Sequence, residues 1–134
     1  MKTILFLCTH NAARSQMAEG LINARYADRY KVHSAGNEPT EVHPCVAKVM
    51  GEVGIDISAQ RAKSLDEFAD VTFHYIVTMC AHAAKNCPIF PGGVKYLERA
   101  FPDSVTATTD ERDQCKPFRE VRDKISAWIE GTFG

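Results

Sequence analysis

Apolar runs of strand length alternate with helical patterns along this chain, and that alternation restricts the fold more than any other feature. The first run, KTILFLC, spans residues 2–8 and is continuous enough for a parallel strand buried on both faces. Directly after it, SQMAEGLINARYADR places four apolar residues on one helical face: Met17, Ala18, Leu21 and Ile22.

The same order continues along the chain. KVHSAG, residues 31–36, predicts a second strand, and FHYIVTMC, residues 73–80, predicts a third. Between them, residues 43–54 predict a helix with Pro44 near its start and Gly54 at its end.

One more strand and two more helices complete the pattern. The run VKYLERAF, residues 94–101, contains the fourth strand. Ser64 and Glu67 form a capping-box pair that opens a short helix. The last helix begins near Pro117 and is expected to stop at Gly131, with a buried face made of Phe118, Val121, Ile125, Trp128 and Ile129.

These elements predict an α/β fold in a single domain, residues 1–134, with a four-stranded parallel sheet flanked by helices on both faces. Right-handed crossovers bring the carboxyl ends of all the strands to one edge, where ligands bind in such folds. Cys8 ends the first strand, Cys80 ends the third, and Asp103 lies just past the fourth. We therefore expect these three side chains at the same edge of the sheet.

Composition limits the partners. Net charge is −1, so no basic surplus indicates binding to nucleic acid or to an anionic membrane. The N-terminal apolar run is too short for a signal peptide, and no stretch approaches the length of a membrane span. These features predict a cytoplasmic protein.

The chain has five cysteines, and an odd number without a secretory signal argues against a structural disulfide framework. Reduced thiols are therefore expected. Neither Cys45 nor Cys115 follows a strand, so both are expected to be bystanders.

The segment CTHNAARS, residues 8–15, has the features of an oxyanion trap. Its backbone N–H groups can point inward, next to the N-terminus of the following helix, and Arg14 adds a planar fork for two oxygens. The same field stabilises a thiolate at Cys8, toward which Ser15 can donate a hydrogen bond while Asn11 braces the loop. The alternative is that Cys8 is only a buried apolar residue at a strand end. We assign the oxyanion-binding loop to Thr9, His10, Asn11, Ala12, Ala13, Arg14 and Ser15.

The segment CTHNAARSQMAEG resembles the phosphate loop of the low-molecular-weight tyrosine phosphatase family, and specifically its arsenate reductase branch. VHSAG, GIDISAQRAKSLDEF, VTMC, CPIFPG and FREVRDKI resemble the same branch, so the likeness covers nearly the whole chain. The fold that this resemblance implies is the four-stranded parallel sheet with flanking helices.

The resemblance also implies a reaction, the reduction of arsenate to arsenite by three thiols. Cys8 forms a thiol–arsenate adduct beside Arg14, Cys80 attacks the Cys8 sulfur and expels arsenite, and Cys87 then resolves the disulfide. A redox-active Cys80–Cys87 disulfide results, which thioredoxin or a low-molecular-weight thiol reduces. Asp103 is the general acid. Phosphate and sulfate are expected to compete with arsenate, and neither a metal nor a tightly bound cofactor is expected.

The spacing of Cys80 and Cys87 bears on this relay. If the residues between them are helical, the two lie ~10.5 Å apart along the helix axis. A disulfide requires Cα atoms within roughly 7 Å, so oxidation must unwind the segment. The proline and glycine residues Pro88, Pro91, Gly92 and Gly93 favour such a loosened end.

Other interpretations remain open at this point. Cys80 and Cys87 can be packing residues, or zinc ligands together with His82, although their spacing is unusual for zinc. A phosphoester hydrolase needs only Cys8 and Asp103, and an oxyanion- or arsenite-binding module needs no turnover at all.

Three positions depart from the family pattern. Pro102 precedes Asp103 where the family has Asp followed by Pro, and Ala12 replaces a serine found in many relatives. Some relatives bind potassium near the loop with an aspartate at about the position of Lys63. The Lys63 ammonium either replaces that ion or is an exposed charge before Ser64.

Overall fold

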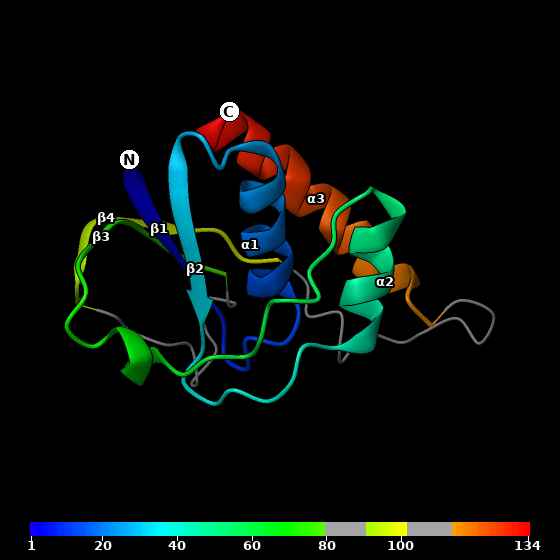
Figure 1. Cartoon of the computed structure of the whole chain (residues 1–134), viewed down its shortest axis with the longest axis horizontal. Coiled ribbons are helices and arrows are strands. Elements are labelled where there is room, and N and C mark those ends of the chain that lie inside the picture. The colour runs from blue at the N-terminus through cyan, green and yellow to red at the C-terminus, as the bar shows by residue number, and fades with distance from the viewer. Residues whose placement is uncertain (80–90, 102–113) are drawn as a thin grey trace.

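The computed structural model describes residues 1–79, 91–101 and 114–134. Its centre is one sheet of four parallel strands in the order β2-β1-β3-β4 (Figure 1). Their bounds are Lys2–Leu7 for β1, Tyr30–Ala35 for β2, Phe73–Thr78 for β3 and Gly93–Glu98 for β4. The predicted parallel sheet is confirmed.

The helices follow the strands as the apolar spacing predicts. They are α1 (Arg14–Arg25), α2 (Pro44–Glu52) and α3 (Lys116–Phe133), with a short 3₁₀ helix, η1 (Leu65–Phe68), between α2 and β3. Ser64 accepts a hydrogen bond from the Asp66 N–H at the start of η1, so the predicted cap is present. Among the described helices, none is long and apolar enough to cross a membrane.

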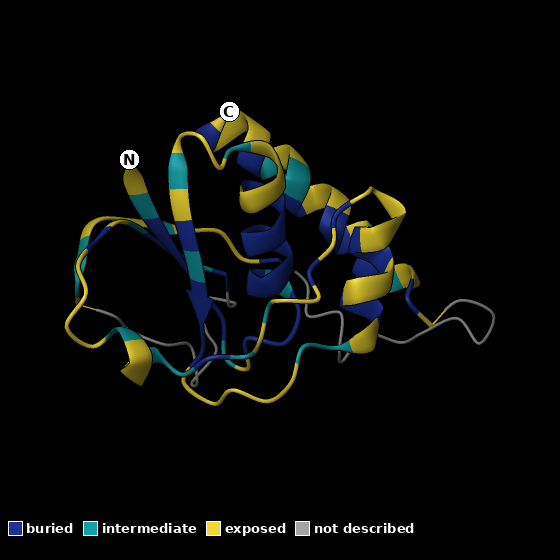
Figure 2. Cartoon of the chain, in the orientation of Figure 1, coloured by how far each residue is buried: buried dark blue, intermediate teal, exposed yellow. Residues whose placement is uncertain are grey.

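The central strand β1 is buried on both faces, as its continuous apolar run predicts. Ile4 and Phe6 belong to a core shared with α1, α2 and α3, whereas Leu5 and Leu7 belong to a second core on the opposite face. In the described part of the chain, that second core is covered by η1 (Figures 1 and 2). The sheet therefore holds the residue after Leu7 at its carboxyl edge, away from bulk water.

The predicted end of the last helix is wrong by two residues. α3 continues through Gly131 to Phe133 because the Phe133 side chain is buried. Its ring packs edge-on against three aromatic rings of the sheet, those of Phe6, Tyr30 and Tyr75. This packing outweighs the weak helix propensity of glycine.

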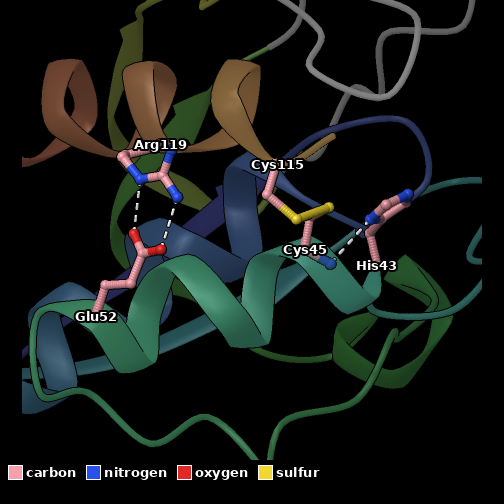
Figure 3. Close-up of a disulfide and its surroundings, with 5 residues drawn as sticks. All are labelled: His43, Cys45, Glu52, Cys115 and Arg119. Atoms are coloured by element: carbon pink, nitrogen blue, oxygen red, sulfur yellow. Dashed lines mark hydrogen bonds and ion pairs between the residues drawn. A yellow bond between two sulfur atoms is a disulfide. The ribbon is translucent and has the colours of Figure 1, made fainter. Parts of the chain in front are cut away.

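The expectation that Cys45 and Cys115 carry reduced thiols is also wrong. The two sulfurs form a disulfide, with 5.2 Å between the Cα atoms (Figure 3). α2 and α3 begin side by side, so residues 70 positions apart in sequence meet. No local pattern reports such a contact.

Further along the same two helices, Glu52 of α2 joins two arginines of α3. Arg119 donates two hydrogen bonds to the Glu52 carboxylate, at 2.8 and 2.6 Å (Figure 3). Arg122 donates to Glu52 at 3.1 Å and to the Val49 carbonyl at 2.8 Å. Hydrogen bonding by Arg119 is the largest cause that lowers the pKa of Glu52 from 4.5 to about 2.

Replacing Glu52 with glutamine should destabilise the protein in a pH-dependent way. Because folding lowers the pKa of Glu52 from 4.5 to about 2, the stabilisation is complete above pH 4.5 and disappears as the pH falls to about 2. Urea unfolding of wild type and Glu52→Gln between pH 2 and 7 measures it. The same substitution at the exposed Glu120 is the control, and a difference that persists unchanged at pH 2 would contradict the assignment.

Candidate active site

The loop between β1 and α1 starts at Cys8, which is 3% exposed and has a free thiol. The Cys8 N–H donates to the Ala35 carbonyl at 3.2 Å, which extends the pairing of β1 with β2 by one residue. A Cβ atom on Gly36 would lie 2.5 Å from the Thr9 carbonyl oxygen and 2.6 Å from that of Cys8. Glycine at position 36 therefore lets the chain after β2 lie directly against the loop.

Two polar side chains orient the Cys8 thiol. Ser15 Oγ lies 2.8 Å from Cys8 Sγ and accepts a hydrogen bond from Asn11 Nδ2 at 2.7 Å. Because Ser15 Oγ already accepts from Asn11, its own proton can be donated to the sulfur. A hydroxyl that donates a hydrogen bond to sulfur stabilises a thiolate more than a thiol. The thiolate is the form that acts as a nucleophile.

Asn11 has the geometry of a brace for the loop. It is fully buried and adopts φ of 51°, in the left-handed region that asparagine tolerates better than most residues. Its Oδ1 accepts from the Lys63 backbone N–H at 2.8 Å and from Gln16 Nε2 at 2.9 Å. The loop is thus fastened both to α1 and to the segment before η1.

Arg14 connects the loop to the ends of two other strands. Its Nη1 donates to the carbonyl oxygens of Met79, after β3, and Phe101, after β4, both at 3.2 Å. These residues immediately precede Cys80 and Pro102 in the sequence. Three of the predicted site residues, Cys80, Cys87 and Asp103, lie outside the described residues.

A cavity of about 290 Å³ opens over this loop. Five of its lining residues come from the loop and were predicted: Cys8, His10, Ala12, Ala13 and Arg14. The other three come from the segment before α2 and were not predicted: Thr40, Glu41 and His43.

Backbone hydrogen bonds hold that segment against the loop. The N–H groups of Glu38, Thr40 and His43 donate to the carbonyls of Thr9, His10 and Ala12, at 3.0, 3.1 and 3.0 Å. Backbone pairing between irregular segments produces no periodic pattern in the sequence. The only sequence signal for it is that the two segments follow the neighbouring strands β1 and β2.

Lys63 lies beneath the loop and is only 8% exposed, so the interpretation as an exposed charge is wrong. Its Nζ lies 3.0 Å from the Arg61 carbonyl oxygen, 3.4 Å from Glu19 Oε1 and 3.5 Å from Ser34 Oγ. Burial raises the pKa of Glu19, and the Lys63 ammonium opposes that rise. A fixed cation therefore occupies a polar chamber that adjoins Asn11.

The arrangement is suited to binding a tetrahedral oxyanion beside a nucleophilic sulfur. Cys8 and Arg14 line the cavity together with other residues of a loop that leads into the N-terminus of α1. Helix N-termini and arginine forks both favour oxyanions.

Comparison with known proteins agrees with this geometry. The family "Low molecular weight phosphotyrosine protein phosphatase" matches residues 3–132. The arsenate reductase of Halalkalibacterium halodurans is 40% identical over 128 residues, which is 96% of this chain and 92% of that protein.

Solved structures of similar fold also include arsenate reductases. One described as an arsenate reductase in the phosphate binding state has a TM-score of 0.82 and 30% identity, covering 98% of this chain and 95% of that one. A thioredoxin-dependent arsenate reductase of Corynebacterium glutamicum has a TM-score of 0.69 and 29% identity, covering 98% of this chain and 61% of that one. With a family match over nearly its full length and the predicted fold, this chain belongs to the low-molecular-weight phosphotyrosine protein phosphatase family.

Proposed function

We propose that this protein reduces arsenate to arsenite by a relay of three thiols that ends in an intramolecular disulfide. The observation that carries the proposal is the Cys8 sulfur, 2.8 Å from Ser15 Oγ, in a residue that lines a cavity together with Arg14. The arsenate reductases among the relatives, at about 40% identity, support the choice of arsenate as substrate.

In the first step, the Cys8 thiolate attacks arsenic and displaces one oxygen, which leaves as water after taking up protons. Arg14 and the loop N–H groups hold the remaining oxygens, and Asp103 is the proposed proton donor. This step joins sulfur to arsenic(V) without changing the oxidation state of arsenic.

In the second step, the Cys80 thiolate attacks the Cys8 sulfur. The sulfur–arsenic bond breaks, its electron pair stays on arsenic, and arsenic(V) leaves as arsenite, arsenic(III). Two electrons come from the two sulfurs, which become the Cys8–Cys80 disulfide. Cys87 then attacks Cys80, releases the Cys8 thiolate and leaves a Cys80–Cys87 disulfide.

Thioredoxin is the proposed electron donor, because the relay ends in an intramolecular disulfide. The thioredoxin-dependent relative from Corynebacterium glutamicum supports this choice. A thioredoxin-coupled cycle needs a reducing compartment, so we place the protein in the cytoplasm. Phosphate is a proposed competitor of arsenate, in agreement with the relative described in a phosphate binding state.

Arsenate turnover with a thioredoxin system, beside a phosphoester assay on the same preparation, tests the proposal. We expect multiple arsenite equivalents per enzyme with thioredoxin, and few when a low-molecular-weight thiol replaces it. Rapid phosphoester hydrolysis without arsenite would favour the phosphatase alternative, since hydrolysis needs only one thiol. Tight oxyanion binding without either reaction would favour a binding module.

Arsenate turnover should not depend on potassium, because the Lys63 ammonium already supplies a buried cation below the loop. Lys63→Asp should lower kcat/KM on the order of tenfold or more in sodium salts, because a shifted loop misplaces Cys8. Potassium salts at equal ionic strength should restore much of that activity.

The comparison is steady-state turnover in sodium and in potassium salts. Lys48→Asp, at an exposed position of α2, is the matched control for the change of charge. A potassium requirement in the wild type would show that the ammonium does not replace an ion.

A further inference from the structure

We propose that Cys45 and Cys115 form a second, reversible dithiol–disulfide site, separate from the three thiols of the proposed relay, and that its redox state positions one wall of the oxyanion cavity. The starting observation is the disulfide itself, which joins α2 to α3 (Figure 3). The proposal stands on this geometry and on oxyanion binding, and it does not require arsenate reduction.

Both cysteines lie at helix N-termini. Cys45 is the second residue of α2, after Pro44, and Cys115 is the N-cap residue of α3. The positive end of a helix stabilises a thiolate, and stabilising the thiolates favours the reduced pair over the disulfide. Two such positions facing each other are therefore suited to a disulfide that opens and closes.

The two helices have other contacts that do not depend on the disulfide. The bonds from Arg119 to Glu52 lie farther along both helices (Figure 3), and Arg122 of α3 also donates to Glu52. Apolar residues of α2 and α3 also belong to one core. Opening the disulfide should therefore release the first turns of the helices and leave their remaining contacts in place.

His43 links these first turns to the cavity. Its Nδ1 accepts a hydrogen bond from the Cys45 N–H at 3.1 Å, and its ring stacks on Phe118 with 4.5 Å between centroids. Its own backbone N–H donates to the Ala12 carbonyl in the oxyanion loop, and His43 is one of the residues that line the cavity. His43 thus contacts both helices that the disulfide joins. If the distance between α2 and α3 changes, His43 moves with them and shifts this wall of the cavity.

The chemistry balances with a hydroperoxide as oxidant. One thiolate sulfur attacks a peroxide oxygen, the O–O bond breaks, and alcohol or water leaves while the cysteine becomes a sulfenic acid. The second thiol then attacks this sulfur, forms the disulfide and releases water. Two electrons pass from the two sulfurs to the peroxide. A small dithiol returns them by thiol–disulfide exchange.

The first test uses the full-length variant Cys8→Ser/Cys80→Ser/Cys87→Ser, in which only Cys45 and Cys115 carry thiols. Alkylation and mass spectrometry count thiols after dithiothreitol, and again after hydrogen peroxide, without denaturant. We expect two thiols and then none, with an unchanged circular dichroism spectrum. Thiols that appear only in denaturant, or a reduced pair that peroxide does not close, would overturn the proposal.

The second test measures inorganic phosphate binding to the same variant in both redox states by calorimetry. Reduction should weaken binding by about two- to tenfold, the effect of releasing one ordered side chain such as His43. The matched control adds Cys115→Ser, which removes the disulfide and should bind phosphate with one affinity whatever the treatment. Equal affinity of the oxidised and reduced pair would refute the link to the cavity. Neither test measures arsenate, so both can fail while the proposed function holds.

Discussion

Replacing Cys8 with serine should abolish arsenite formation and lower any phosphoester hydrolysis by about 10⁴-fold or more, as the loss of a nucleophile does in other enzymes. The sulfur is the group in the cavity that can form a bond to arsenic and later give it up with two electrons. A serine hydroxyl can do neither at neutral pH. Single-turnover arsenite release and a phosphoester assay measure the two losses.

The structure provides a control for this variant. Arg14 is held by the Met79 and Phe101 carbonyls, and Asn11 by Lys63 and Gln16, without help from the Cys8 sulfur. Cys8→Ser should therefore keep phosphate affinity within a few fold of wild type. If phosphate binding disappears together with activity, the loss reflects a distorted loop. If arsenite release survives, Cys8 is not the nucleophile.

The sheet and its loop could be predicted because their signals are local. A continuous apolar strand followed at once by a helical pattern specifies a parallel sheet and puts the residue after the strand at its carboxyl edge. Cys8, Arg14 and Ser15 are all within this single strand–helix connection, so their relation to one another follows from short-range geometry. The Cys8–Ser15 contact at 2.8 Å agrees with that prediction.

Contacts between distant segments were not predictable in the same way. The Cys45–Cys115 disulfide depends on α2 and α3 starting side by side, and no spacing within either helix reports it. His43 enters the cavity wall through a backbone bond to Ala12, in which side-chain identity has no part. The same reason explains α3, where burial of Phe133 outweighs the local signal of Gly131.

Burial decides between the two interpretations of Lys63, a replacement for a bound cation or an exposed charge, which the sequence alone left open. A lysine before a capping serine is usually solvated, and no pattern marks this one as internal. Glu19, from α1, and Ser34, from β2, are joined by a hydrogen bond and both lie within 3.5 Å of the Lys63 ammonium. A cation chamber built from three separate segments can be recognised only once the fold is known.

Cys87→Ala should release about one equivalent of arsenite per enzyme and then stop. Cys8 and Cys80 suffice for one two-electron reduction, and without Cys87 the enzyme remains as a Cys8–Cys80 disulfide. Arg14 donates to the Met79 carbonyl, next to Cys80 in the sequence, which supports Cys80 as the nearer second thiol. Rapid-quench arsenite measurement gives the stoichiometry, and peptide mapping after alkylation identifies the trapped disulfide.

Two further variants separate the relay from hydrolysis. Cys80→Ala should release little arsenite but keep whatever phosphoester hydrolysis the loop supports, because Cys8 and Arg14 are unchanged. Cys45→Ala lies outside the relay and removes the Cys45–Cys115 disulfide, so it should weaken oxyanion binding by at most about tenfold and still turn over many times with thioredoxin. In a simple phosphatase, substitution of Cys80 or Cys87 would leave turnover unchanged. Many turnovers by Cys87→Ala with thioredoxin, or a trapped disulfide without Cys80, would show that electrons follow another path.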